Sequence, residues 1–224
     1  SRGLGDVYKR QVLEIGHDTF EVLATAGDTY LGGDDIDMRL LDYFADLFQK
    51  QTKINIRKDL TALQRLRDVA EETKKAFSQK NSVKVHIPQL YTAADGSTLD
   101  LDTVIDDKTF TRLTMDLVQR SFKVCDEALQ LGGLTVHDLD GVIMVGGPTR
   151  LPLVRQSVEH YFGKQPMIGI DPDEVVALGE LRTWLEAAVE MSYQATGHRR
   201  VRNPRIWSFH DMEALCSGSW SETT

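Results

Sequence analysis

The apolar residues of this chain change their spacing several times, and these changes restrict its fold more than any single residue does. From Ile36 to Phe48 they recur at helical intervals, whereas "SVKVHIP" at 82–88 alternates in the way a strand does. Helical spacing is also found at about 58–78, 107–131 and 152–162, and again from Asp173 onward. Further β-prone runs lie at 12–15, 19–26, 98–105 and 142–145. Strands joined to covering helices predict an α/β fold.

Local breakers define the ends of several of these elements. A Gly-His-Asp turn at 16–18 separates the first two β-prone runs, so we expect them to form a hairpin. Proline lacks a backbone N–H, so we expect the strand at 82–88 to stop at Pro88. The Asp95-Gly96 turn precedes the next strand, and Gly132-Gly133 ends the helix at 107–131.

Charge and cysteine content narrow the possible partners. The chain has 224 residues and a formal net charge of -8, which is typical of an acidic globular protein and argues against nucleic acid as a partner. No apolar run approaches the roughly 20 residues needed to cross a bilayer, so no membrane association is expected. Cys125 and Cys216 form neither a metal-ligand spacing nor a disulfide framework. These features predict a cytoplasmic protein.

The two ends differ from the rest of the chain. Residues 1–11 and 181–224 show no sustained period, and we expect both segments to be disordered. "DVYKRQ" at 6–11 resembles a translated sequencing adaptor, which predicts that the natural protein starts near Val12 and that this chain is a fragment. The tail carries all three tryptophans and is interpreted as a shifted reading frame.

The segment "GVIMVGGPTR" at 141–150 offers a first candidate site. A strand that delivers Gly146-Gly147 to the start of a helix presents backbone N–H groups to an anion such as phosphate. The alternative is that the turn needs glycine only for its backbone angles. Thr149 would then cap the helix and Arg150 would be a solvated surface charge.

A second candidate is a helix face. Glu71, Lys74, Lys75 and Ser78 are spaced i, i+3, i+4 and i+7, so they share one face of the predicted helix. Such a face can hold a polar ligand, or it can be a water-facing stripe of Glu–Lys pairs. Acids in "GGDDID" at 32–37 allow a metal site, but their position at a helix start has an electrostatic explanation. No catalytic triad and no metal site are predicted.

Four stretches in order resemble the ATPase domain of the seventy-kilodalton heat-shock chaperones, the DnaK family. They are "FEVLATAGDTYLGGDDID", "LQRLRDVAEETKKAFS", "MVGGPTRLP" and "DPDEVVALG". The resemblance spans about 12–180 and implies the second lobe of an actin-like ATPase fold. It implies an α/β subdomain that contacts nucleotide, from 12–31 and 108–180, and an inserted helical subdomain at 32–107.

The resemblance also implies a site for ATP or ADP. Glu71, Lys74 and Ser78 match positions that bind ribose and adenine, and Lys75 and Arg150 match the pair that flanks the base. Pro148 departs from the family, which has serine there. The full set of nucleotide-binding residues so implied is Gly33, Glu71, Lys74, Lys75, Ser78, Gly146, Gly147, Thr149, Arg150 and Asp173.

In the intact family the implied function is to couple ATP hydrolysis, with magnesium, to binding and release of unfolded polypeptides. The implied partners are a J-domain co-chaperone and a nucleotide-exchange factor. The first phosphate loop and catalytic lysine have no match here, so we expect an inactive chain that binds nucleotide weakly, with a dissociation constant on the order of 0.1–1 mM. The alternatives are a non-catalytic module that docks an exchange partner, or another actin-superfamily ATPase such as a sugar kinase or cell-shape protein.

Overall fold

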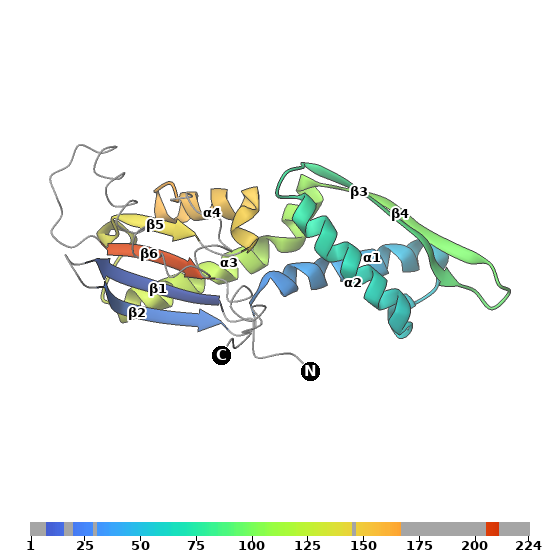
Figure 1. Cartoon of the computed structure of the whole chain (residues 1–224), viewed down its shortest axis with the longest axis horizontal. Coiled ribbons are helices and arrows are strands. Elements are labelled where there is room, and N and C mark those ends of the chain that lie inside the picture. The colour runs from blue at the N-terminus through green and yellow to red at the C-terminus, as the bar shows by residue number, and fades with distance from the viewer. Residues whose placement is uncertain (1–7, 16–19, 29–30, 145–146, 167–204, 211–224) are drawn as a thin grey trace, which may run out of the picture. The chain divides into compact units, whose positions relative to one another are not determined.

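A computed structural model describes residues 8–15, 20–28, 31–144, 147–166 and 205–210 (Figure 1). The chain divides into two compact units. Unit 1 comprises 1–32 and 118–224, and unit 2 comprises 33–117. The described elements are mixed α and β, as the sequence predicts.

Unit 1 contains a four-stranded sheet in the order β2-β1-β6-β5. Strand β1 (Tyr8–Ile15) pairs antiparallel with β2 (Phe20–Asp28), which confirms the predicted hairpin. Strand β6 (Arg205–His210) pairs antiparallel with β1 and parallel with β5 (Gly141–Met144). The two strands furthest apart in the sequence are therefore neighbours in the sheet.

The predicted disorder of the two ends is wrong for two segments. Residues 8–11 form the first half of β1, and residues 205–210 form β6. Ile206, Trp207 and Phe209 belong to the residue types enriched in strands, but six residues are too few for a sustained period. The remainder of both ends lies outside the described residues, as does the helical pattern predicted from Asp173.

Arg205, the first residue of β6, binds neighbouring segments through its backbone N–H, its carbonyl and its side chain. The backbone N–H of Arg205 donates to Asp140 Oδ2 at 2.7 Å, and the N–H of Asp140 donates to the Arg205 carbonyl at 2.7 Å. The Arg205 guanidinium lies 3.3 Å from Glu14 Oε1 on β1. Arg205 thus joins β1 to the segment that precedes β5.

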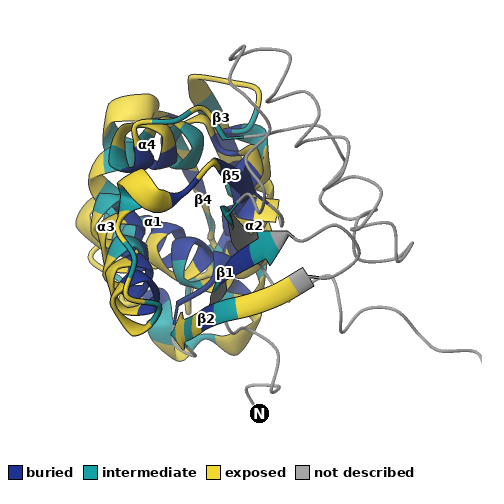
Figure 2. Ribbon diagram, turned by 90° about the vertical axis from the view of Figure 1, so that its left-hand side faces the viewer, coloured by how far each residue is buried: buried dark blue, intermediate teal, exposed yellow. Residues whose placement is uncertain are grey.

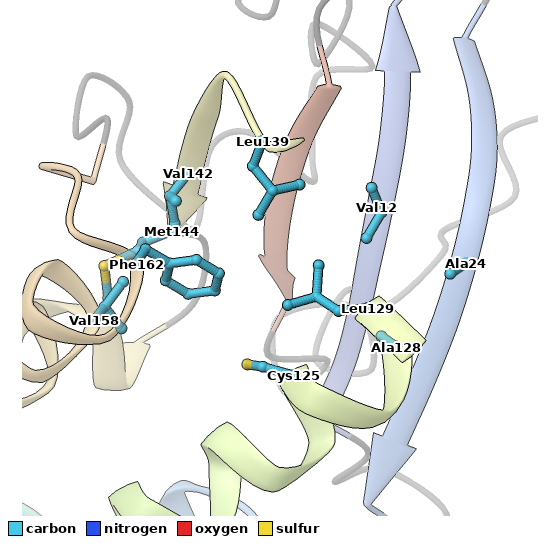
Figure 3. Close-up of a cluster of buried hydrophobic side chains, with 10 residues drawn as sticks. All are labelled: Val12, Ala24, Cys125, Ala128, Leu129, Leu139, Val142, Met144, Val158 and Phe162. Carbon is cyan, nitrogen blue, oxygen red and sulfur yellow. The ribbon is translucent and has the colours of Figure 1, made fainter. Parts of the chain in front are cut away.

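Two of the described helices contribute to the core of unit 1. They are the later part of α3 (Asp107–Leu131) and α4 (Pro152–Phe162), whose bounds match the predicted helices. Figure 3 shows the buried side chains that β1, β2, β5 and both helices contribute to this core. A Cβ atom at Gly132 would lie 3.3 Å from Ala24 Cβ, so the turn after α3 passes close to β2. Strand β5 is buried along its length, whereas β2 exposes much of its surface (Figure 2).

Unit 2 contains helices α1 (Gly33–Thr52) and α2 (Leu60–Ala76), a two-stranded ribbon and the first part of α3. Helix α1 packs against α2, and β3 (Ser82–Thr92) pairs antiparallel with β4 (Thr98–Asp106). Of the six apolar residues that predict α1, the helix buries Ile36, Leu40, Leu41, Phe44 and Phe48, whereas Leu47 is half-buried. A one-turn helix, η1 (Ile56–Lys58), precedes α2.

The predicted end of a strand at Pro88 is wrong, because β3 continues to Thr92. The register of β3 against β4 shifts between Ile87 and Tyr91, so proline lies in an irregular stretch where a missing N–H is tolerated. Arg65 of α2 donates to the carbonyls of Pro88 and Gln89, both at 2.7 Å. These bonds hold the irregular stretch in place.

Candidate functional site

Polar residues gather within unit 2 where α1 begins and α2 ends. We call this set the α1–α2 polar cluster: Gly33, Asp37, Glu71, Lys74, Lys75 and Ser78. Five of these six are residues that the sequence predicts to bind nucleotide. For the sixth residue, Asp37, the sequence predicts only a favourable interaction of its charge with the start of a helix.

Lys74 is directed toward α1. Its ammonium lies 2.6 Å from Asp37 Oδ2 and donates to the Gly33 carbonyl at 3.3 Å. The side chains of Lys74 and Asp37 are only 13% and 11% exposed. The interpretation of a purely water-facing stripe is therefore wrong for Lys74.

Asp37 is a buried carboxylate with one oxygen unused. Lys74 binds Oδ2, while Oδ1 is buried and has no hydrogen-bond partner. Burial raises the pKa of Asp37 above its ordinary value, the Lys74 ammonium opposes this rise, and the charges of Glu71 and Asp34 add to it. A buried acceptor without a donor costs free energy, so this aspartate is not explained by stability alone.

The other members of the α1–α2 polar cluster lie nearer to water. Glu71 and Lys75 form an i,i+4 ion pair of 2.5 Å with side chains 49% and 68% exposed, as the stripe interpretation predicts. The hydrogen bond from Lys75 lowers the pKa of Glu71 below its ordinary value. Ser78 lies beyond the end of α2, and its hydroxyl donates to the Lys75 carbonyl at 2.6 Å. Only three of the four predicted residues are thus on the helix itself.

The Gly-Gly corner in unit 1 leads into a short turn before the long helix. Gly147–Arg150 form the 3-10 turn η3, and α4 starts at Pro152 after Leu151 as its N-cap. The expectation that Thr149 caps this helix is wrong: Thr149 is buried within η3, and its carbonyl accepts a hydrogen bond of 2.8 Å from Arg155. The sequence alone does not show whether the helix starts after Thr149 or at Pro152, because threonine and proline are both favoured at helix starts.

Gly147 is not required by the backbone or packing around it. Gly147 does not have the positive φ of Gly96, Gly133 and Gly163, and a Cβ atom added to it would meet nothing within 4 Å. The interpretation that Gly147 is needed for its backbone angles is therefore wrong. Gly147 and Arg150 are both exposed, and Gly146 and Asp173 lie outside the described residues.

The predicted residues fall into two groups, each within one unit. Unit 2 brings together Gly33, Glu71, Lys74, Lys75 and Ser78, and unit 1 holds Gly147, Thr149 and Arg150 in one turn. Sequence reasoning missed Asp37 as the partner of Lys74. The available indication was its spacing: Asp37 precedes Leu41 by four residues and Phe44 by seven, which places a carboxylate on the apolar face of α1.

Within the described part of the chain, no group of three or more His, Cys, Asp or Glu residues is placed to hold a metal ion. None of the helices in those same ranges is both long and apolar enough to cross a membrane.

Fold and site together describe a mixed α/β protein with a cluster of hydrogen-bonding and charged groups at the junction of two helices. The Hsp70 protein family matches residues 4–190, which include all ten predicted site residues. The chain belongs to the Hsp70 family. This is a family of heat-shock chaperones that bind ATP or ADP with magnesium, bind client polypeptides and work with co-chaperones.

Proposed function

We propose that this chain is part of the ATP-binding domain of a chaperone and that it recognises the adenosine portion of ATP or ADP. The observation that carries the proposal is the family match, because it covers every residue assigned to nucleotide. These residues are Gly33, Glu71, Lys74, Lys75, Ser78, Gly146, Gly147, Thr149, Arg150 and Asp173.

The α1–α2 polar cluster supports this proposal by its chemistry. The vicinal hydroxyls of a ribose both donate and accept hydrogen bonds, so they suit an ammonium and a carboxylate that lie near each other. Lys74 and Glu71 are such a pair, since the charge of Lys74 contributes to the lowered pKa of Glu71. The Ser78 hydroxyl donates a hydrogen bond to the Lys75 carbonyl, which leaves its oxygen able to accept a hydrogen bond from an N–H of the base.

The turn at 147–150 supports a contribution from unit 1. A Cβ atom added at Gly147 would meet nothing within 4 Å, so a ligand can approach this part of the backbone closely. The Arg150 guanidinium is planar and can stack on an adenine ring. Pro148 has no N–H, so Gly147 is the donor that we assign to phosphate in this turn.

Magnesium is assigned no ligand in the α1–α2 polar cluster. Both carboxylates of this cluster bind lysine ammoniums, Asp37 to Lys74 and Glu71 to Lys75. Because each carboxylate already binds an ammonium, the cluster does not offer the several oxygen ligands that a divalent ion requires.

The proposal extends to the architecture. We assign residues 12–31 and 108–180 to an α/β subdomain that contacts nucleotide, and 32–107 to an inserted helical subdomain, both within the second lobe of an actin-like ATPase fold. The compact unit at 33–117 supports the second assignment. In this assignment the parent chaperone couples ATP hydrolysis to binding and release of unfolded polypeptides, with a J-domain co-chaperone and a nucleotide-exchange factor as partners.

Titration of the chain with adenosine, ADP and ATP, followed by NMR, tests the proposal. We expect saturable binding of all three, weakened at least several-fold by Lys74→Ala and by Arg150→Ala. Lys84→Ala, which removes a cation from β3, serves as the control and should leave affinity unchanged. Equal binding of guanosine, or equal affinities in all three variants, would contradict adenosine recognition.

A further inference from the structure

The Lys74 ammonium has one N–H left after its contacts with the described residues. A lysine carries three such donors, and the described residues accept two of them, at Asp37 Oδ2 and the Gly33 carbonyl. The remaining N–H is available to another acceptor. A ligand oxygen can therefore be added without breaking either existing contact.

Asp37 also restrains the lysine before any ligand arrives. A free lysine side chain samples many rotamers, and fixing it on binding costs conformational entropy. Here the cost is met on folding, because the ion pair of 2.6 Å holds a side chain that is only 13% exposed. Restraint of this kind raises affinity by reducing what must be ordered on binding.

The choice of a carboxylate at this position has a cost to the fold. Asp37 lies on the buried face of α1, where its neighbours one and two turns along the helix are apolar, and its Oδ1 has no donor. Burial raises its pKa, which shows that the site disfavours the charge. Apolar residues in place of both Asp37 and Lys74 would avoid this cost, as replacements of whole buried ion pairs in other proteins show.

We propose that Asp37 is a positioning residue for nucleotide recognition: its carboxylate holds Lys74 so that the remaining N–H meets a ribose hydroxyl oxygen. This role rests on the adenosine recognition proposed above. Asp37 itself touches no ligand, because Oδ2 is bound to Lys74 and Oδ1 is buried.

The test compares Asp37→Asn with the unaltered chain, using adenosine, 2′,3′-dideoxyadenosine and adenine as probes in NMR titrations. Asparagine keeps the size of the side chain and removes its charge. We expect adenosine affinity to fall about 5- to 10-fold, while the affinities for dideoxyadenosine and adenine stay the same. Asp34→Asn, an exposed carboxylate in the same turn, is the matched control and should change none of the three.

Stability measurements separate positioning from a structural role. Unfolding by urea should show a cooperative transition for Asp37→Asn, whose amide oxygen can still accept a hydrogen bond from Lys74. Asp37→Leu leaves the Lys74 ammonium without its partner and should be less stable, whereas Asp37→Leu combined with Lys74→Met replaces both charges and should be as stable as the unaltered chain or more so. In a Lys74→Ala background, Asp37→Asn should have no further effect on adenosine binding.

The possible failures are distinguishable. An equal loss of affinity for all three probes in Asp37→Asn would indicate a structural role and overturn the proposal. Weaker adenosine binding in Lys74→Ala but unchanged binding in both Asp37 variants would overturn positioning alone. Absence of adenosine binding by the unaltered chain would overturn both positioning and the proposed function.

Discussion

Hydrogen bonds from a single residue, Thr135, lower the pKa of the Asp138 carboxyl group. The amide and the hydroxyl of Thr135 both donate to Asp138 Oδ2, at 2.8 and 2.7 Å, at the start of the one-turn helix η2 (Val136–Asp138). The hydroxyl bond first, and then the amide bond, lower the pKa of Asp138 below its ordinary value of 3.8. A lowered pKa means that Asp138 stabilises the fold above pH 3.8 and loses this contribution as the pH falls through the lowered value.

Replacement of Thr135 by valine tests this assignment. Thr135→Val removes the hydroxyl and keeps the amide, so we expect the pKa of Asp138 to rise part of the way back to 3.8. Carboxyl chemical shifts followed by NMR across acid pH measure it. Asp106, whose pKa is lowered by Thr109 instead, should titrate identically in both proteins.

At the same residue scale, the sequence predicts where side chains lie better than it predicts their partners. Helical spacing correctly put Glu71, Lys74 and Lys75 on one helix, and an i,i+4 pair between Glu71 and Lys75 follows from it. The partner of Lys74 is 37 residues earlier in the chain, on α1. Spacing within one helix carries no information about which neighbouring helix will pack against it.

Helix α2 illustrates what an element needs at its ends. It begins after Asp59, whose carboxylate accepts the backbone N–H groups of Thr61 and Ala62, both at 3.0 Å. The predicted start at Lys58 is early by two residues, because the chain first makes the one-turn helix η1. Aspartate is among the preferred residues at a helix cap, so Asp59 is the residue in the sequence that indicates the true start of α2.

We expect Asp59→Ala to lower the free energy of unfolding by about 1 kcal/mol, since two backbone donors at the start of α2 lose their acceptor. Urea unfolding monitored by circular dichroism measures the change. Asp59→Asn keeps an acceptor oxygen and should recover most of the stability. A loss equally large in the asparagine variant would show that charge, and not capping, is responsible.

The strand β3 marks the limit of local reasoning about elements. Proline was expected to end it, and in isolation that is the normal effect. The strand continues because Arg65, more than 20 residues earlier, binds the carbonyls at Pro88 and Gln89. Helices with a clear period were predicted closely, while an irregular strand that depends on a distant side chain was not.

At the scale of the whole molecule, the sheet of unit 1 depends on the last described segment. Strand β6 lies between β1 and β5, so it supplies all the strand pairing that joins them. This pairing could not be predicted because Glu14 and Arg205, which meet across β1 and β6, are 191 residues apart. The α/β class follows from the pattern of elements, but the order of strands does not.

A proline within β6 tests this dependence. The N–H of a strand residue with neighbours on both sides points to one of them, so Ser208→Pro removes a ladder hydrogen bond. The acceptor left without a donor should destabilise unit 1 by about 1–3 kcal/mol. Amide hydrogen exchange should speed up in β1 and β5, and Ser208→Ala should leave it slow. Unit 2 contributes no strand to this sheet and serves as an internal reference. Unchanged protection of β1 and β5 in the proline variant would show that β6 does not join them.

The place of β6 also determines when unit 1 can be finished on the ribosome. Translation delivers the β1–β2 hairpin first, and β6, which pairs with the other side of β1, follows 191 residues later. At ordinary elongation rates of about 5–20 residues per second, the interval is on the order of 10–40 s. During this interval one edge of β1 has unpaired N–H and C=O groups, which can form hydrogen bonds with strands of other nascent chains. A member of a chaperone family would itself need protection during its own synthesis.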